Sequence, residues 1–168
     1  EAWGVKEIPL YASESMIQLI NESPNLSHLF TNGHLIPMSF IDGKEIQLGP
    51  GFSITPLRVP HRDELTDTFA FLINTNSTKL LFLPDHDSWD ETLSLYSQKD
   101  PRSWFQSLFV DIVLLDATFW SGDELDGNAR NIGHPVVEET LELLGRRAPS
   151  DPRIIFFHFN HTNPLLDE

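Results

Sequence analysis

The sequence predicts a fold of the α/β class, in its α+β form, and three observations support this prediction. Short alternating or apolar segments separated by turn residues fill the first half of the chain, a pattern typical of antiparallel strands. Helical segments alternate with apolar strands in the second half, as in strand–helix–strand units. The apolar segments 80–83, 110–115 and 154–157 are each followed by Asp or His. We therefore expect helices on one side of a sheet and polar side chains at the ends of its strands.

Composition sets limits on the kind of protein this is. A chain of 168 residues, 40% of them hydrophobic, is expected to form one domain with a substantial core. Its net charge of −14 argues against nucleic-acid binding, because phosphate backbones would be repelled. No apolar run reaches membrane-spanning length, so we expect no membrane partner and a soluble protein, with the cytoplasm favoured as its location. Cysteine is absent, so any metal would bind to His, Asp, Glu, Asn or backbone oxygen.

The first half is predicted to be a β meander preceded by a strand and a helix. Residues 6–12 alternate as a strand, and Ser13 is a suitable N-cap for a helix that ends near residue 20. Residues 21–33 are rich in Ser, Pro, Asn and Gly and are predicted to form a loop. Asp42 and Gly43 predict a hairpin turn. The strands expected before and after this turn are residues 35–41, 45–48, 52–59, 68–73 and 79–83.

The second half is predicted to contain three helices and two strands. Asp87 or Ser88 can cap the first helix, Pro101 can begin the second, and Gly145 can end the third. In order, we expect helices at 89–96 and 101–108, a strand at 110–115, a polar loop at 116–133, a helix at 135–144 and a strand at 153–159.

Three residues at strand ends are candidate metal ligands. His61 follows the strand at 52–59, Asp85 follows the strand at 79–83, and His158 ends the last apolar run. Taken singly, these residues have ordinary interpretations as a loop histidine, a helix cap and a core histidine. Taken together, they form a set of ligands suited to Zn, Mn or Fe. The spacing of the three residues does not decide between a metal site and these ordinary interpretations.

Further residues are candidates for roles beside the metal. His134 precedes a helix, where the dipole favours a neutral imidazole that can transfer protons, although a helix cap is an equal alternative. Asp116 ends a buried strand and could orient a ligand histidine. Trp120 could line a substrate pocket, or simply pack. His161 and Asn163, beyond the last strand, are candidates for substrate binding or for supporting the ligands, whereas His28 and His34 are interpreted as exposed loop residues.

Two segments carry a resemblance to a known family. Leu114-Leu-Asp-Ala-Thr-Phe-Trp120 and His158-Phe-Asn-His-Thr-Asn-Pro-Leu-Leu-Asp-Glu168 resemble the pyrroloquinoline quinone (PQQ) synthesis protein B family of the metallo-β-lactamase superfamily. The resemblance implies a four-layer αββα sandwich with metals between its sheets. The superfamily's His-x-His-x-Asp-His motif is absent from the chain. Residues 1–168 are therefore expected to be one partial domain, incomplete at both ends, which would expose apolar surface and favour association of copies into a homo-oligomer.

The resemblance also implies roles for individual residues. His61 corresponds to a histidine ligand of the third motif, Asp85 to a carboxylate that bridges two metals, and His158 to the last histidine ligand. His134 corresponds to a histidine that protonates the leaving group in phosphodiesterase relatives. The chain departs from the quinone-synthesis family in having Asp85 where those proteins have a Gly-rich turn, which favours a hydrolase site with two metals.

The function expected from these observations is that of a metal-dependent hydrolase. It would cleave an ester or phosphodiester of a small-molecule substrate with water bound to a divalent metal, Zn being favoured over Mn or Fe, with two ions in the complete protein. Activity is not expected of the chain as a fragment. One alternative is an iron-dependent oxidation step in PQQ biosynthesis, and another is a non-catalytic metal-binding or scaffold module.

Overall fold

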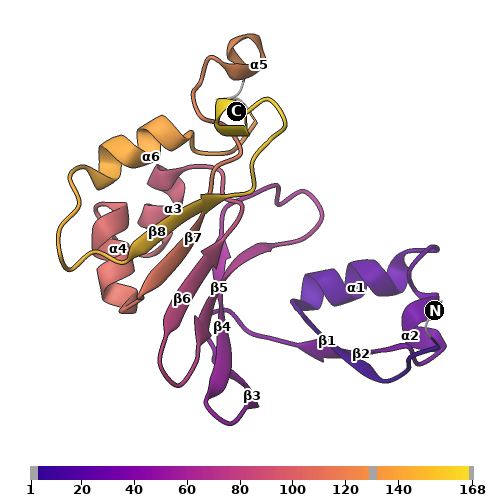
Figure 1. The fold of residues 1–168 in the computed structure, drawn as a ribbon. Helices are drawn as coiled ribbons and strands as arrows, with labels where there is room; N and C mark the ends of the chain where they lie inside the picture. Colours follow the sequence, from indigo (N-terminus) through magenta and orange to yellow (C-terminus); the bar gives the residue numbers. More distant parts are fainter. Residues whose placement is uncertain (1–3, 129–131, 167–168) are drawn as a thin grey trace.

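The structure is a computed structural model that describes residues 4–128 and 132–166 (Figure 1). Its main element is a six-stranded sheet in the order β3-β4-β5-β6-β7-β8, and a separate two-stranded sheet pairs β1 with β2. The strands are β1 (Ile8–Ala12), β2 (Leu35–Ser39), β3 (Ile46–Gly49), β4 (Phe52–Val59), β5 (Thr68–Asn74), β6 (Lys79–Leu83), β7 (Ile112–Asp116) and β8 (Arg153–Phe157). The helices are α1 (Glu14–Glu22), α2 (His28–Thr31), α3 (Trp89–Leu95), α4 (Pro101–Leu108), α5 (Glu124–Gly127) and α6 (Val137–Leu144), followed by a 3-10 turn at Pro164–Leu166.

The sheet changes from antiparallel to parallel along the chain. Strands β3 to β6 are joined by turns and pair antiparallel, whereas β6, β7 and β8 pair parallel. Each parallel connection contains helices, as the geometry of a crossover requires. Because β4 and β6 are both antiparallel to β5, they run in the same direction. The carboxyl ends of β4, β6, β7 and β8 therefore share one edge of the sheet.

Local sequence explains where the principal helices begin. Ser13 accepts a hydrogen bond from the Met16 amide, and Ser88 accepts one from the Glu91 amide. Asp100 and Ser103 form a reciprocal capping box at the start of α4, with Pro101 at the first helical position. Each cap satisfies amide groups that would otherwise lack a partner, which stabilises the helix by about 1 kcal/mol.

The core lies between the sheet and helices α3, α4 and α6, which cover one of its faces (Figure 1). Alternate strand residues point into this core, and Trp89, Trp104 and Phe105 pack on them from the helices. The buried strand residues are Leu57, Val59, Ala70, Leu72, Leu81, Leu83, Val113 and Leu115. The described residues thus supply a sheet and one layer of helices, which is part of the sandwich that the resemblance implies.

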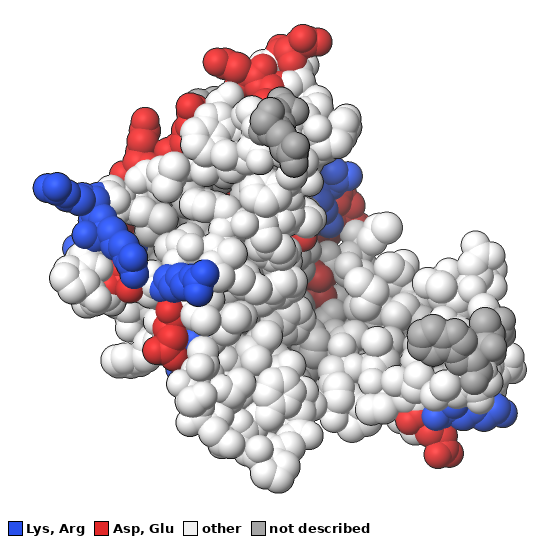
Figure 2. Space-filling view, viewed as in Figure 1, with Lys and Arg blue, Asp and Glu red and all other residues white. Residues whose placement is uncertain are grey.

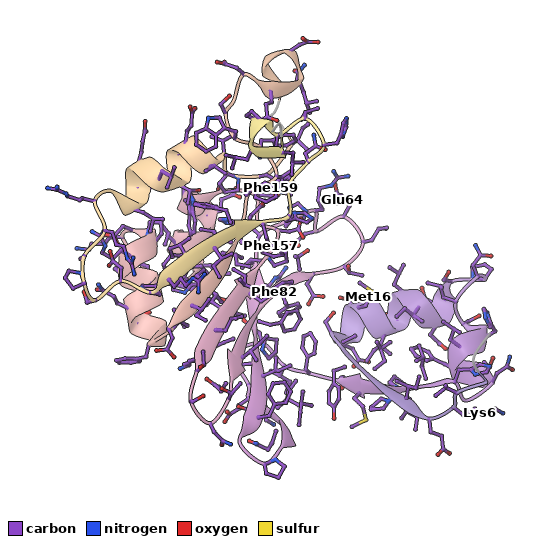
Figure 3. The ribbon with its side chains drawn as sticks, in the orientation of Figure 1. Lys6, Met16, Glu64, Phe82, Phe157 and Phe159 are labelled. Carbon is purple, nitrogen blue, oxygen red and sulfur yellow. The ribbon has the colours of Figure 1, made fainter. Side chains whose placement is uncertain are left out.

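The opposite face of the sheet is also apolar. Phe82 of β6 and Phe157 of β8 lie there with ring centroids 5.3 Å apart (Figure 3). Phe40, just beyond β2, packs edge-on against Phe69 and Phe71 at 5.0 and 6.2 Å, so that the β1–β2 unit contacts part of this face. Association of copies through the remaining apolar surface stays a prediction.

The predicted hairpin at Asp42 and Gly43 is wrong in its pairing. The turn forms, but β2 pairs in parallel with β1, and β3 pairs with β4 instead. The chain between β1 and β2 forms α1 and α2, and this connection allows β2 to pair in parallel with β1. A turn sequence after β2 does not predict this long-range pairing. The predicted loop at 21–33 also contains α2, and the predicted loop at 116–133 contains α5. None of the described helices is both long and apolar enough to cross a membrane.

The loop before β8 is fastened to α4 by an ion pair. Arg102 donates from Nε to Asp151 Oδ1 at 2.9 Å, and the Ala148 amide donates to Asp151 Oδ2 at 2.7 Å. The hydrogen bond from Ala148, together with the positive charge of Arg102, lowers the pKa of Asp151 below its ordinary value of 3.8. The folded state therefore favours the ionised carboxylate.

We predict that Asp151→Asn lowers the free energy of unfolding by about 1–2 kcal/mol at pH 7, because charge-assisted hydrogen bonds are lost. Since the folded pKa is lowered, this contribution is present above pH 3.8 and disappears as the pH falls through the folded pKa. Urea denaturation at neutral and acidic pH measures the difference. Asp63→Asn, which removes an exposed ion pair with Arg58, is the control and should change stability little. A destabilisation by Asp151→Asn that persists at low pH would contradict this account.

Candidate metal centre

The candidate site forms where the carboxyl ends of four strands meet. Asp85 follows β6, Asp116 is the last residue of β7, and His158 follows β8. His61 follows β4, which runs in the same direction as β6, and His134 lies in the loop before α6. Sequence analysis singled out all five of these residues, and the fold brings them together at one edge of the sheet.

A buried carboxylate lies at the bottom of the site. The side chain of Asp116 is only 1% exposed. Its Oδ1 accepts hydrogen bonds from the Thr118 amide at 2.9 Å and from the Thr118 hydroxyl at 2.7 Å. Its Oδ2 lies 2.6 Å from Nδ1 of His134. A buried carboxylate is stable only with such partners, so this cluster fixes both Thr118 and His134.

The Asp85 carboxylate lies between two histidines. Its Oδ1 is 3.8 Å from Nε2 of His61 and 3.7 Å from Nδ1 of His158. Ligand atoms of Asp85, Asp116, His134 and His158 all lie within 4.8 Å of one another. Carboxylates and imidazoles that converge in this way, from separate strand ends, are a suitable donor set for a divalent cation.

The orientation of the His61 side chain is set by Asp87, and hydrogen bonds of the neighbouring backbone hold both residues in place. Its Nδ1 lies 3.0 Å from Oδ1 of Asp87, which leaves Nε2 directed towards Asp85. The Asp87 amide donates to the Pro60 carbonyl at 2.7 Å, and the Thr68 hydroxyl donates to the His61 carbonyl at 2.7 Å. A carboxylate behind an imidazole fixes its tautomer and strengthens it as a ligand.

The backbone of His158 adopts a left-handed conformation, with φ of +64°. This conformation is uncommon for a residue other than glycine, and it ends β8 abruptly. Nδ1 of His158 lies 3.1 Å from the Thr118 hydroxyl and 3.8 Å from Oδ1 of Asp116. The turn therefore directs the imidazole back over the ends of β6 and β7, although the side chain is 44% exposed.

Electrostatics favour a proton on His134. Burial alone would lower its pKa, but the hydrogen bond to Asp116 and the negative charges of Asp116, Asp85 and Asp87 raise the pKa above 6.5. The sequence suggested a neutral imidazole because a helix follows. In the structure, the carboxylates determine the protonation of His134, and its Nδ1 is engaged by Asp116.

His86, between Asp85 and Asp87, is buried beside the site and contacts α3. It is 1% exposed, and its Nδ1 lies 3.0 Å from the Thr92 hydroxyl. Its ring packs edge-on against Trp89 at 4.6 Å. Burial, only partly opposed by the charge of Asp116, lowers the pKa of His86 to about 4. A neutral His86 therefore anchors the loop that presents the two carboxylates.

The remaining predicted residues lie around the site rather than inside it. Asn163 is buried and donates from Nδ2 to the Ala117 carbonyl at 2.8 Å, which holds the chain after β8 against the end of β7. Trp120 is half-buried, and its amide donates to Glu124. His161 is exposed. His28 and His34 lie on the β1–β2 unit, where Nδ1 of His34 is 2.9 Å from the Val5 carbonyl.

Three residues of the site were not identified from the sequence. The sequence offered Asp87 or Ser88 as the cap of α3; Ser88 is the cap, and Asp87 instead orients His61. Nothing in the sequence indicated a role for Thr118 except its position two residues after Asp116. Gly133 has a φ of +76°, and a Cβ atom there would lie 2.5 Å from Oδ1 of Asp87. A Gly-His-Pro sequence at residues 133–135 is typical of a turn, but it does not reveal that Asp87 is the neighbour of Gly133.

Comparison with known proteins identifies the class of protein. The profile of the β-lactamase superfamily domain matches residues 3–159, so the chain belongs to that superfamily. Its fold is similar to those of metallo-β-lactamase proteins, which agrees with the resemblance found in the sequence.

Individual proteins of this superfamily are similar to the chain. Coenzyme PQQ synthesis protein B of Nitrosococcus oceani is 29% identical over 140 residues, which cover 76% of this chain and 42% of the relative. The structure of Zn²⁺-bound PqqB from Methylobacterium extorquens has a TM-score of 0.65 at 17% identity, covering 96% of this chain and 58% of that one. A diphosphatase of the PhnP family has a TM-score of 0.58 at 18% identity, with coverages of 94% and 49%. The chain therefore resembles PqqB and spans about half the length of these relatives.

We predict that Gly133→Ala lowers metal affinity in addition to the loss of stability that its left-handed backbone conformation would cause. The added Cβ must displace Asp87, so His61 would lose its orienting partner and metal affinity should fall by about tenfold or more. Gly43→Ala is the matched control, since Gly43 has a φ of +68° with open space around it and should only lower stability, by about 1 kcal/mol. Zn²⁺ titration and thermal unfolding separate the two effects. Equal metal affinities in the two variants would contradict the predicted contact.

Proposed function

We propose that this chain forms the site of a metal-dependent hydrolase that cleaves an ester or phosphodiester of a small-molecule substrate. One observation supports this proposal above the others: candidate ligand atoms of Asp85, Asp116 and His158 lie within 4.8 Å of one another, and an imidazole nitrogen of His134 lies within the same distance of them. These residues come from segments that are distant in the sequence, so their convergence is a property of the fold and not of a local motif.

The donors fit a divalent metal, with Zn²⁺ favoured over Mn²⁺ or Fe²⁺. Thiolates are absent, and imidazoles combined with carboxylates suit all three ions. Asp85 has a histidine on either side of Oδ1, which fits a carboxylate shared by two metals, one held by His61 and the other by His158. Zn²⁺ is the ion named for the PqqB structure from Methylobacterium extorquens.

A metal bound at this site would acidify a water molecule and polarise the scissile group. Side chains of this chain would supply the proton for the leaving group and hold the reacting side chains in position. Asp116 engages Nδ1 of His134 and keeps a proton there, which leaves Nε2 of His134 as the atom that can give a proton to the leaving-group oxygen. The raised pKa of His134 favours the protonated form that such a donor needs. Thr118 and Asp87 act by holding the other side chains in place.

The bridging role of Asp85 predicts a loss of metal in Asp85→Ala. We expect the variant to retain at most about half of the metal bound by the unaltered protein, because both histidines would lose their shared carboxylate. Elemental analysis after dialysis against metal-free buffer measures the stoichiometry. Asp90→Asn, on the exposed surface of α3, is the control for a general effect of charge. An unchanged stoichiometry in Asp85→Ala would rule out the bridging role.

The role of His134 as a proton donor predicts a loss of rate without a matching loss of metal. In His134→Gln, hydrolysis of bis(4-nitrophenyl) phosphate should slow by about 10²–10⁴-fold, while the metal content stays near that of the unaltered protein. The assay uses this chain and the longest natural form of the protein, each loaded with Zn²⁺, Mn²⁺ or Fe²⁺. If His134→Gln loses its metal, His134 is a ligand and not the proton donor.

A second candidate function follows from the named relatives. The relative from Nitrosococcus oceani is named for the synthesis of coenzyme PQQ, and a site of His and carboxylate side chains suits Fe²⁺. The second candidate is therefore an iron-dependent oxidation step in PQQ biosynthesis. Oxygen uptake by the Fe²⁺-loaded protein distinguishes this reaction from hydrolysis. Bound metal with neither activity would support a non-catalytic metal-binding module.

A further inference from the structure

A cavity lies beside β8 and extends to the end of the strand that is opposite the candidate metal centre. It has a volume of about 210 Å³ and lies between α4, α6 and the first residues of β8. Phe105, Leu141, Ile154 and Phe156 supply apolar parts of its wall. The cavity is somewhat smaller than the roughly 300–1,000 Å³ of sites for drug-sized ligands, so it suits a small ligand.

Arginines complete the wall of this cavity. Arg102, Arg147 and Arg153 line it together with a single carboxylate, that of Asp151. Asp151 is engaged by Arg102 and by the Ala148 amide, so its charge is already compensated. Within the described parts of the chain, the guanidinium groups of Arg147 and Arg153 form no hydrogen bond and no ion pair, although the positive charge of Arg147 also acts at longer range on the Asp151 carboxylate. They remain available to an anion.

The charge of this region is opposite to that of the chain as a whole. The chain has 25 acidic and 11 basic residues, whereas arginine predominates around the cavity. Figure 2 shows Lys and Arg side chains gathered on the side of the molecule where α4, α6 and the start of β8 lie. On a protein that repels anions generally, a local group of guanidinium groups beside an apolar wall is a selective place for a small anion to bind.

We propose that this cavity binds a small organic anion, in which a carboxylate or phosphate head is attached to an apolar body. The head would pair with Arg147 and Arg153, and the body would lie against Phe105, Leu141 and Phe156. The site is independent of the proposed hydrolase function, because Arg153 begins β8 and His158 follows its other end. With about 3.3 Å per strand residue, Arg153, which would hold the anionic head, is more than ~10 Å along the strand from His158.

The test is a titration of the metal-free chain with phenylacetate and, separately, with phenyl phosphate. Binding is monitored by the changes in amide chemical shifts in NMR spectra. We expect saturable shifts at residues 141–156 with at least one of these probes. Inorganic phosphate and 2-phenylethanol, which lack the apolar body and the charge respectively, should each bind at least about tenfold more weakly. Arg147→Gln should weaken binding of the anionic probe by about tenfold, as expected for a lost charge-assisted hydrogen bond.

The matched control is Arg146→Gln, which removes the neighbouring guanidinium without altering the wall of the cavity. This variant should change the affinity by less than about twofold. The proposal is overturned if Arg146→Gln and Arg147→Gln weaken binding equally, or if 2-phenylethanol binds as tightly as the anions. Shifts confined to the strand ends near Asp85 and His158 would overturn it as well, since they would assign the anion to the metal centre.

Discussion

The burial of the Asp116 carboxylate is the constraint on which the site depends. A carboxylate that is only 1% exposed at the end of an interior strand would be costly to bury unless hydrogen-bond donors surround it. Thr118 supplies two of these donors from the turn that follows β7, and His134 supplies another from a loop 18 residues further along the chain. The same Thr118 hydroxyl lies beside His158. One buried charge therefore fixes the positions of a turn and of two histidines.

The sheet supplies the frame within which these interactions act. Parallel pairing of β6, β7 and β8 sets Asp85, Asp116 and His158 on adjacent strand ends, and the direction of β4 adds His61. The face of the sheet towards the helices is rigid, with fully buried Leu81, Leu83, Val113 and Leu115 behind the ligands. A closely packed core has low compressibility, so the strand ends hold the candidate ligands at a spacing that is set by the fold.

Sequence reasoning succeeded where the signal was local. The bounds of β4, β6 and α4 were predicted residue for residue, because alternation, flanking turns and Pro101 define them without tertiary information. The pairing of β2 was wrong because a turn at Gly43 does not determine which strands become neighbours. His61, Asp85, Asp116, His134 and His158 were found from their places beside strand or helix ends, and their chemical roles stay predictions. The contact between Gly133 and Asp87 joins two loops across space, which no pattern along the chain records.

The change from antiparallel to parallel pairing has a consequence for how the chain folds. Strands β3 to β6 pair with sequence neighbours through short turns, so this part of the sheet can form early. We expect the pairing of β7 with β6 to form later, because it closes a long connection that contains α3 and α4, and the same holds for the pairing of β8 with β7 across α5 and α6. We therefore expect His61 and Asp85 to reach their places before Asp116 and His158. A chain in which β8 has not yet paired would hold Asp85 and Asp116 on adjacent strand ends without His158, so the geometry of the candidate site would depend on the step at which β8 joins β7.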